Sequence, residues 1–470
     1  MDFLAPIRKA YAWATGGSTY DAVTSRGKRR QPTGLLRRED DELRPQDRKK
    51  AISSTNTLNR NFATAAWAIR CHLNYVSTFT FQARNENEAL NKKLETLVET
   101  RSRAENFEVT GRYPRPRFIR MAELRRTLDG DMGIAKIYNG RVQATEGDCI
   151  RTPDSGLPSG YAAADFIHGV RTNRIGRPLE YCVCRRGASN DSVSGGTRFE
   201  FERMVNARNM LHFGYFDRFD QVRGISPLIS AVNAFQDVYE GIDYALAKAK
   251  VAQMFGLVFS RERGDEGPTV GTAEQETESS GYKVSLDRGP FSLDLDAGDK
   301  AEFLEAKTPS TEFQNFSQVV IAIALKSLDI PYSFFDESFT NYSGARQALL
   351  QYEASAQIKQ NDVRELLDKW LEWQLFIWAL DGDLPGVDIA SVHWEWIAKG
   401  MPWIDPLKEA NADISLLGAG LTSRTRLLRR RGEDVNEVAR ELAAEKKLFE
   451  DNGLTVGVNP VNAQILEIAQ

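Results

Sequence analysis

The chain has 470 residues, of which 41% are apolar and 27% charged, and its formal net charge is −4. This length is more than one ordinary hydrophobic core accommodates and indicates about two to four domains. The nearly balanced charge excludes a protein that binds nucleic acid over a generally basic surface, so any such contact must come from local patches.

The first 52 residues are predicted to form an N-terminal arm that is partly basic. Residues 24–50 hold ten lysines and arginines against five acidic residues. Such a run is typical of a solvated, mobile arm, and the alternative is a contact with phosphate or with a protein partner. No long apolar region follows the first residues, so we expect no signal peptide.

Residues 53–224 are predicted to form an α+β body. Ser53–Thr55 are candidate caps of a first helix, and a second helix is predicted over Asn85–Ala104. Between residues 110 and 220, short alternating runs such as Leu179–Val183 are separated by glycine, proline, asparagine and aspartate. This pattern predicts strands joined by loops.

The cysteines and histidines of this body do not form a metal-binding pattern. Cys182 and Cys184 lie two positions apart in a predicted strand and should share one face. No further ligands occur at matching spacing, so reduced thiols in a cytosolic compartment are expected. His393 and Glu395 should also share one side of a strand, as a structural pair rather than a catalytic base.

A long helix is predicted to begin at Ser226-Pro227, with serine as the cap and proline in the first turn. Gly241 lies inside this helix at a cost of about 1 kcal/mol, which indicates a packing reason or a bend. Residues 262–305 then form a small unit with twelve acidic and four basic residues, and a helix follows over Thr311–Leu328. An acidic insertion therefore separates two helices.

The stretch from Pro331 to Leu380 dominates the second half of the chain. A polar, aromatic turn is predicted through Gly344, and the 36 residues of 345–380 contain neither proline nor glycine. A helix of this length spans roughly 54 Å, against about 10–14 residues in a usual globular helix. Three tryptophans near its end predict packing in the core or at a subunit interface: Trp370, Trp373 and Trp378.

The remainder predicts an aromatic stretch over Val387–Trp403, helical pieces up to Phe449, and a weakly ordered tail after Gly453. The sequence has no phosphate-binding loop, no G-x-S-x-G and no H-E-x-x-H motif. Asp294, Asp296 and Asp299 lack the glycine and glutamate of a calcium loop. We therefore expect no enzyme activity, no cofactor and no metal. The longest apolar run has seven residues, too few for the ~20 that cross a bilayer.

Several short motifs follow one another in a fixed order between about Asn56 and Gly453, and together they resemble the tailed-phage portal proteins of the lambda type. The motifs are Arg218-x-x-Gln221-x-Arg223-Gly224-Ile225-x-Pro227, Ile330-Pro331, Asn341-Tyr342-Ser343-x-x-Arg346, Trp403-x-Asp405-Pro406-x-Lys408-Glu409, Gly420-Leu421-Thr422 and Gly432-x-Asp434.

This resemblance implies a homo-oligomeric ring, usually a dodecamer, at one capsid vertex of a virion assembled in the host cytoplasm. Double-stranded DNA would pass through the ring, which would also meet the large terminase, the major capsid protein and head–tail connector proteins, and no membrane. The resemblance implies an N-terminal arm at 1–52 and the first part of a wing at 53–224. A stem helix at 225–257, a clip at 258–308 and a second stem helix at 310–329 would follow. The remaining parts would be a tunnel loop at 330–344, the long helix and second part of the wing at 345–400, a crown at 401–453 and a tail at 454–470.

The same layout implies roles for individual residues. Lys326 would face DNA in the channel, or would alternatively form an intersubunit ion pair. The other candidate channel residues are Asn341, Tyr342, Ser343 and Arg346, of which the first three could instead only form the turn before the long helix. The implied clip contacts to terminase or connector are Glu274, Glu276, Glu278, Asp294 and Asp296. The implied wing anchors or interface residues are Trp370, Trp373, Trp378, Arg218 and Arg223.

Two other functions compete with this interpretation. A head–tail adaptor ring that is not a portal would lack the very long helix and the 262–305 insertion. A packaging nuclease or ATPase would need a phosphate loop or a carboxylate metal site, and the sequence provides neither.

Overall fold

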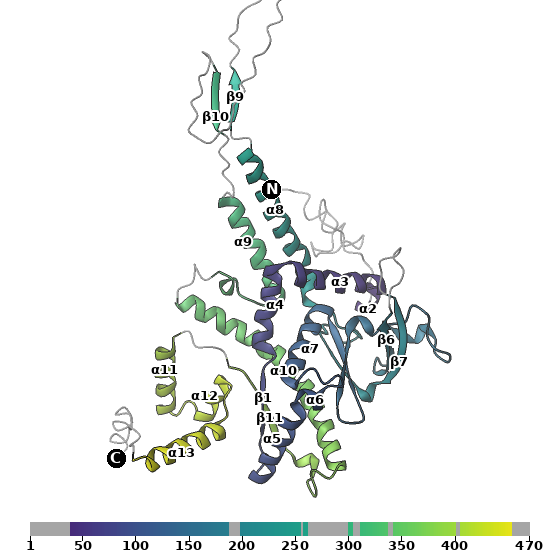
Figure 1. The fold of residues 1–470 in the computed structure, drawn as a ribbon, viewed down its shortest axis with the longest axis vertical. Coiled ribbons are helices and arrows are strands. Elements are labelled where there is room, and N and C mark those ends of the chain that lie inside the picture. The colour runs from purple at the N-terminus through teal and green to yellow at the C-terminus, as the bar shows by residue number, and fades with distance from the viewer. Residues whose placement is uncertain are drawn as a thin grey trace, which may run out of the picture.

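Helices and antiparallel strands alternate along the chain and form an α+β fold, as the sequence predicts (Figure 1). The computed structural model describes residues 38–187, 198–254, 257–261, 299–303, 311–336, 342–400 and 405–453. Within these ranges, none of the helices combines the length and apolarity that a bilayer crossing requires.

The first described elements are the helices α2 (Glu39–Glu42), α3 (Pro45–Asn61) and α4 (Ala63–Val76). The prediction of an arm up to residue 52 is therefore wrong at its end, and Ser53–Thr55 are not caps. Helix α3 begins earlier because Pro45 supplies the backbone angle of a first helical turn. Thr55 lies inside the helix, where its hydroxyl donates to the Leu128 carbonyl at 2.7 Å.

Three further helices complete the helical part of the body. The predicted helix over Asn85–Ala104 is confirmed as α5 (Glu88–Ser102), which is capped by Asn87, and α6 (Ala104–Phe107) follows it. Helix α7 (Arg115–Asp129) was not predicted. Its buried side carries Glu123, Arg126 and Asp129 among apolar residues, and these charges hide the helical period of the apolar positions.

Two antiparallel sheets follow. The first has the order β3-β2-β8, with β3 (Val142–Glu146), β2 (Asp131–Lys136) and β8 (Met210–Gly214). The second has the order β4-β5-β6-β7, with β4 (Phe166–Ile167), β5 (Val170–Thr172), β6 (Pro178–Arg186) and β7 (Phe199–Asn206). Strand β6 is buried on both faces, since Tyr181 and Val183 belong to one apolar cluster and Cys182 and Cys184 to another. The predicted common face of the two cysteines is confirmed.

A helix pair projects from this body (Figure 1). The chain runs outward through the short 3-10 helix η4 (Pro227–Ala231) and α8 (Val232–Met254), and returns along α9 (Thr311–Leu325). The outer end of the pair carries β9 (Leu257–Arg261) and β10 (Asp299–Phe303), which are paired antiparallel. Gly241 has a packing reason, because a Cβ there would lie 3.2 Å from the Phe313 ring on α9.

The long helix is confirmed as α10 (Tyr342–Leu380), with 39 residues. It is reached from α9 through the 3-10 helices η5 (Lys326–Leu328) and η6 (Tyr332–Phe334). After α10 and η8 (Ile389–Ser391), strand β11 (Trp394–Ala398) pairs with β1 (Phe79–Ala83) far back in the chain.

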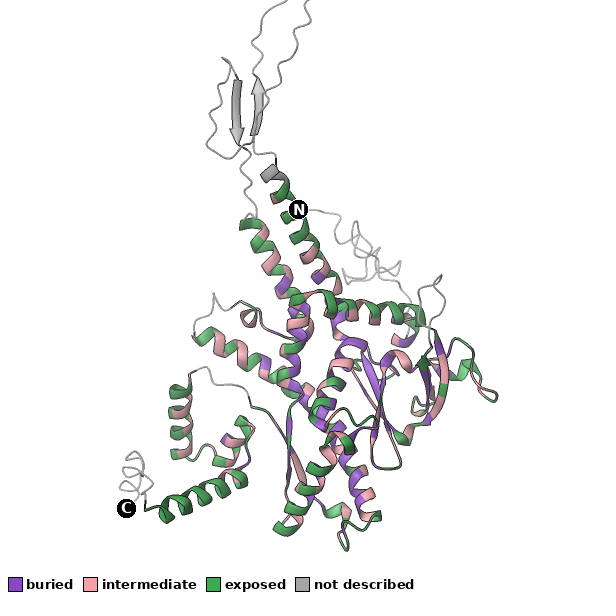
Figure 2. Cartoon of the chain, in the orientation of Figure 1, coloured by how far each residue is buried: buried purple, intermediate pink, exposed green. Residues whose placement is uncertain are grey.

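The C-terminal helices are α11 (Pro406–Gly418), α12 (Arg424–Arg431) and α13 (Val435–Asp451), and they lie at the end opposite to β9 and β10 (Figure 1). The largest core cluster joins α4, α5, α7, β2 and the second half of α10. Buried residues gather there in Figure 2, whereas most of α8, α9 and α11–α13 is exposed or half-buried.

Candidate functional site

The connection from α9 to α10 is held by a polar cluster around Asp329. This residue has a left-handed backbone (φ 61°) directly after η5. Its carboxylate accepts hydrogen bonds from Ser355 Oγ at 2.6 Å and from Lys359 Nζ at 2.9 Å, and Lys359 also donates to the Leu328 carbonyl at 3.0 Å. Burial alone would raise the pKa of Asp329, but the contacts with Ser355 and Lys359 hold this pKa below its usual value. The α9 end is thus fastened to α10.

The predicted channel residues have different surroundings. Lys326 is exposed in η5, and it makes no ion pair with any residue in the described ranges. Arg346 pairs with Glu409 of α11 at 3.2 Å. Asn341 lies outside the described residues, and so does the side chain of Tyr342. Ser343 is exposed in the first turn of α10.

The predicted turn from Pro331 to Gly344 is wrong at its end, because Tyr342 to Gly344 belong to the helix. Serine and glycine lower helix propensity only modestly at a terminus, where the backbone donors have no intrahelical partner in any case. The predicted clip residues cannot be placed, since all five lie outside the described residues: Glu274, Glu276, Glu278, Asp294 and Asp296.

Helix α9 carries apolar side chains on two opposite faces. One face lines a groove of about 530 Å³ shared with α8 and η6, whose apolar lining includes Ile242, Leu246, Phe313, Ile321 and Phe335. The other face carries Phe316, Val319 and Ile323, which are 62%, 58% and 62% exposed. At about 100° per residue, the centres of the two faces lie roughly 200° apart around α9. We call them the groove and the ridge.

The three tryptophans of α10 lie within the subunit. Trp370 and Trp378 are 3% and 2% exposed in the main core cluster, and Trp373 packs against it half-buried. The Trp370 ring centroid lies 5.4 Å from that of Phe107 and 6.3 Å from that of Trp396. These contacts attach the end of α10 to α6 and β11.

The segment Arg218-x-x-Gln221-x-Arg223-Gly224 is a folded loop around a buried carboxylate. Asp131 has no exposed surface and accepts from Arg223 Nε and Nη2, both at 2.7 Å, and from Arg48 Nη2 at 2.8 Å. The Gly224 amide and His212 Nε2 add contacts at 2.8 and 3.1 Å. Burial disfavours the carboxylate, but the charges of the two arginines outweigh it and hold the pKa of Asp131 well below its usual range.

The other residues of this loop support the same group of contacts around Asp131, which we call the Asp131 node. Gln221 donates to the Arg223 carbonyl at 2.7 Å and accepts from the Asp217 amide at 2.9 Å. Arg218 lies at the surface, where it pairs with Glu39 at 3.6 Å and Asp220 at 3.5 Å. The buried Arg223 therefore fastens the start of η4 and α8 to β2, while the ion pairs of Arg218 with Glu39 and Asp220 are exposed to solvent and screened.

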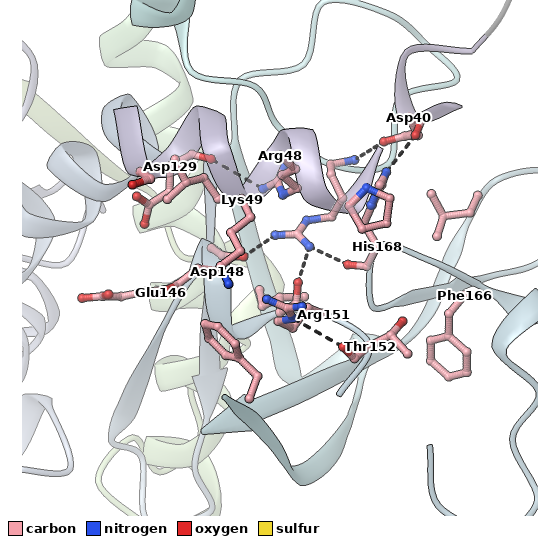
Figure 3. A pocket seen from close by; sticks show the side chains of 18 of the residues that line it. Asp40, Arg48, Lys49, Asp129, Glu146, Asp148, Arg151, Thr152, Phe166 and His168 are labelled. Atoms are coloured by element: carbon pink, nitrogen blue, oxygen red, sulfur yellow. Dashed lines mark hydrogen bonds between the residues drawn. The ribbon is translucent and has the colours of Figure 1, made fainter. Parts of the chain in front are cut away.

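Beside the node lies a pocket of about 930 Å³ (Figure 3). Arg48, Asp129, Asp148 and Arg151 are among the charged residues that line it. These charges are already paired: Asp129 with Arg125 at 2.5 Å, Asp148 with Arg186 at 2.7 Å, and Arg151 with Asp154 at 3.1 Å. Many of the charged groups that line the pocket are therefore already engaged in ion pairs.

Gly224 allows the closest backbone approach in this region. A Cβ at Gly224 would lie 2.3 Å from the Gly130 carbonyl oxygen, and one at Gly130 would lie 2.5 Å from the Gly224 oxygen. Neither neighbour is the end of a flexible side chain, so the two backbones would have to separate.

We expect Gly224→Ala to destabilise the chain by about 3 kcal/mol, the upper end of the usual overpacking cost. The matched control is Gly418→Ala, because a Cβ there meets nothing within 4 Å. Thermal unfolding followed by circular dichroism should show a lowered midpoint for Gly224→Ala alone. Equal midpoints for the two variants would contradict the steric argument.

A second buried network was not predicted. His72 Nε2 lies 2.8 Å from Glu123 Oε1, which also accepts from Tyr215 at 2.9 Å, and Arg126 pairs with both Glu123 and Asp362 of α10. Burial lowers the pKa of His72 despite the neighbouring Glu123 carboxylate. The network joins α4, α7 and β8 to α10.

Nothing in the described ranges brings three or more histidine, cysteine, aspartate or glutamate side chains together as a metal site. The predicted His393–Glu395 pair is wrong. Glu395 pairs instead with Arg84 at 3.2 Å and Arg429 at 2.9 Å, and His393 Nδ1 lies 2.8 Å from the Ser391 carbonyl.

The C-terminal motifs are helix caps. Asp405 accepts from the Lys408 amide at 3.2 Å and starts α11, with Pro406 in the first turn. Gly432 ends α12 in the left-handed conformation (φ 80°), and Asp434 starts α13. Asp434 is also buried and pairs with Arg84 at 2.5 Å, which ties the C-terminal helices to the end of β1.

Several known proteins are similar to this chain. The probable portal protein of Halomonas phage phiHAP-1 is 22% identical over 377 residues, which cover 75% of this chain and 70% of that protein. Two solved necks of gene transfer agent particles are each 14% identical. The neck of the empty particle, computed with C6 symmetry, has a TM-score of 0.46 and covers 81% of this chain and 94% of its own. The neck of the native particle, computed with C12 symmetry, has a TM-score of 0.44. The alignment covers 80% of this chain and 91% of that chain.

The residue pattern that defines the family described as "Phage portal protein, lambda family" matches residues 28–360. This match spans the α+β body, the projecting helix pair and the first half of α10. Because it includes well over half of the 470 residues, the chain belongs to the lambda family of phage portal proteins.

Proposed function

We propose that this protein forms a closed ring at one vertex of a phage capsid and that double-stranded DNA passes through its centre during packaging and ejection. The observation that carries the proposal is the pair of opposite apolar faces on α9, the groove and the ridge. Membership in the portal family supports the same function.

The two faces favour a ring over a symmetric dimer. A dimer with a two-fold axis uses one self-complementary patch on both copies. Here the concave groove and the convex ridge lie on opposite sides of one helix, so the ridge of one copy can enter the groove of the next. Such a head-to-tail contact continues from copy to copy until the rotation closes a ring.

Exposure of the ridge to water is energetically unfavourable, so a partner surface should bury it. Phe316, Val319 and Ile323 together leave a contiguous apolar stripe in water on a helix that projects from the body. Fully burying a side chain of this size stabilises by about 1.5–3 kcal/mol. A dodecamer is the subunit number that we propose, as in the family layout.

Within this layout, residues 45–224 and 342–400 are the wing, 225–257 and 310–329 the stem, 258–308 the clip, 330–341 the tunnel loop and 401–453 the crown. Residues 1–44 and 454–470 are the arm and the tail. The Asp131 node then connects wing and stem, and the Asp329 cluster connects stem and long helix. We place Lys326 and Ser343 toward the DNA, and Arg346 at the junction of long helix and crown.

The proposed partners are DNA, the large terminase and later the connector proteins at the clip, and the major capsid protein around the ring. The protein would be assembled in the host cytoplasm and remain in the virion. Its role would be structural, and hydrolysis of ATP and cleavage of DNA would belong to its partners.

Purified protein imaged by negative-stain electron microscopy should show rings with a central pore, and it should lack ATPase and nuclease activity. The activity assays should contain Mg²⁺, since both alternative functions require it. Compact monomers at every salt concentration would contradict the ring. DNA cleavage or ATP hydrolysis that co-purifies with the chain would favour the packaging enzyme instead.

A further inference from the structure

Helix α12 is the most basic element of the described chain. Its eight residues contain five arginines and no acidic residue, in a chain whose net charge is −4. Two of the arginines hold the helix in place, Arg429 through Glu395 at 2.9 Å and Arg431 near Asp413 at 3.6 Å. The other three are Arg424, Arg426 and Arg430.

These three arginines are exposed, and none has a carboxylate within ion-pair distance among the residues that the structure describes. Arg426 and Arg430 are four positions apart and therefore lie on the same side of the helix. Three unpaired guanidinium groups on so short a helix repel one another, and a polyanion would relieve this repulsion.

The fold holds α12 rigidly. Leu427 is 7% exposed and anchors its inner side. Its last turn touches the backbone after β11, because a Cβ at Gly400 would lie 2.1 Å from the Arg430 carbonyl oxygen. Ser423 caps the first turn through the Arg426 amide at 3.3 Å. The free arginines thus project from a fixed support, which reduces the entropy lost on binding.

A polar groove of about 570 Å³ extends this basic surface toward α10. Arg430 and Lys399 line it, and Lys399 is exposed. The carboxylates in the groove include Glu395, which is shared by Arg84 and Arg429, and Asp368, which accepts from the Trp394 indole at 2.7 Å. These two carboxylates are therefore already engaged.

We propose that Arg424, Arg426 and Arg430 contact the phosphate backbone of double-stranded DNA. Arginine stays charged and matches phosphate oxygens with two parallel donors. A cluster of exposed cations without a base-reading element binds without sequence preference. The inference rests on the proposed function, which brings DNA past every subunit.

The location separates this contact from the channel. Helix α12 lies at the end of the subunit opposite to the β9–β10 pair (Figure 1), away from the α9–α10 connection. A channel that lets DNA slide must avoid tight phosphate neutralisation. The arginine helix would instead retain DNA at one end of the ring.

The test compares assembled wild-type rings with the triple variant Arg424→Gln, Arg426→Gln, Arg430→Gln. Binding of a short fluorescein-labelled duplex is followed by fluorescence anisotropy over a series of salt concentrations. The variant should bind about tenfold or more weakly at low salt. Its log–log salt slope should fall by roughly 2–3 for each subunit that contacts the duplex, at about 0.9 per phosphate neutralised.

The matched control is Arg174→Gln, Arg177→Gln, Arg208→Gln, which removes the same charge from exposed positions on the β5–β6 turn and η3. An equal loss in both variants, or unchanged affinity in the α12 variant, would overturn the inference. Micrographs of the same samples separate the two proposals. Rings without the α12 effect refute the DNA contact alone, whereas absent rings in wild type refute the proposed function.

Discussion

Asp131→Asn should destabilise the folded chain by about 3–5 kcal/mol, the usual cost of breaking a buried ion pair from one side. The substitution keeps the shape of the side chain but removes the charge that compensates two buried arginines. Arg223 is 1% exposed and Arg48 is 6% exposed, so neither guanidinium can turn toward water. The loss should release the start of α8 from β2.

Urea denaturation followed by circular dichroism, at matched protein concentration, measures this effect. Glu200→Gln is the control, because its ion pair with Arg185 at 2.9 Å is exposed on both sides. Surface pairs of this kind contribute up to about 1 kcal/mol. A Glu200 variant that loses as much stability as the Asp131 variant would show that the node has no special role.

The pH dependence of this deficit follows from the sign of the pKa shift. The folded pKa of Asp131 is depressed, so its stabilisation is complete above the unfolded value of about 3.9. It is lost only as the pH falls through the folded pKa. The difference between wild type and Asp131→Asn should therefore be the same at pH 5 and pH 8.

The sequence predicted the order of the large elements because that order depends on long, uninterrupted patterns. The 36 residues without proline or glycine specified the long helix, and the change to acidic residues marked the insertion between α8 and α9. Cap chemistry identified the starts of η4 and α11 at Ser226 and Asp405. These signals are local, so no tertiary contact can remove them.

Helix α7 was missed because its buried face contradicts the rule that buried positions are apolar. Glu123 and Arg126 have no exposed surface, yet each satisfies the other and a partner on a distant element. These partners are distant along the chain. His72 lies 51 positions from Glu123, and Asp362 lies 236 positions from Arg126. Spacing along one segment cannot reveal them.

The sequence indicates the Asp131 node only weakly. The motif around Arg223 was visible, but its carboxylate partner was a single aspartate at the start of an apolar strand. A charged residue just before the apolar run Met132–Ala135 indicates a buried cationic partner. The groove, by contrast, needs side chains from α8, α9 and η6 together, so only the folded chain defines it.

The double variant Val319→Glu, Ile323→Glu should abolish ring assembly while leaving the subunit folded. Both residues are more than half exposed, so the substitutions cost the isolated subunit little. In a ring, each would place a carboxylate in the neighbour's apolar groove, which costs several kcal/mol at every contact. Size-exclusion chromatography with light scattering should show monomers with an unchanged circular dichroism spectrum. Ile175→Glu, at an exposed apolar residue far from the helix pair, should still form rings.

Mixing tests whether ridge and groove are partners. Leu246→Glu, in the groove, should also yield monomers when purified alone. The ridge variant keeps an intact groove and the groove variant keeps an intact ridge, so an equimolar mixture should form heterodimers that cannot grow further. In such a heterodimer, the intact ridge of the Leu246 variant fills the intact groove of the ridge variant. The two faces that remain free each carry introduced glutamates, so no third subunit can bind. A mixture that stays monomeric would mean that the two faces do not bind each other, and rings from either variant alone would place the subunit interface elsewhere.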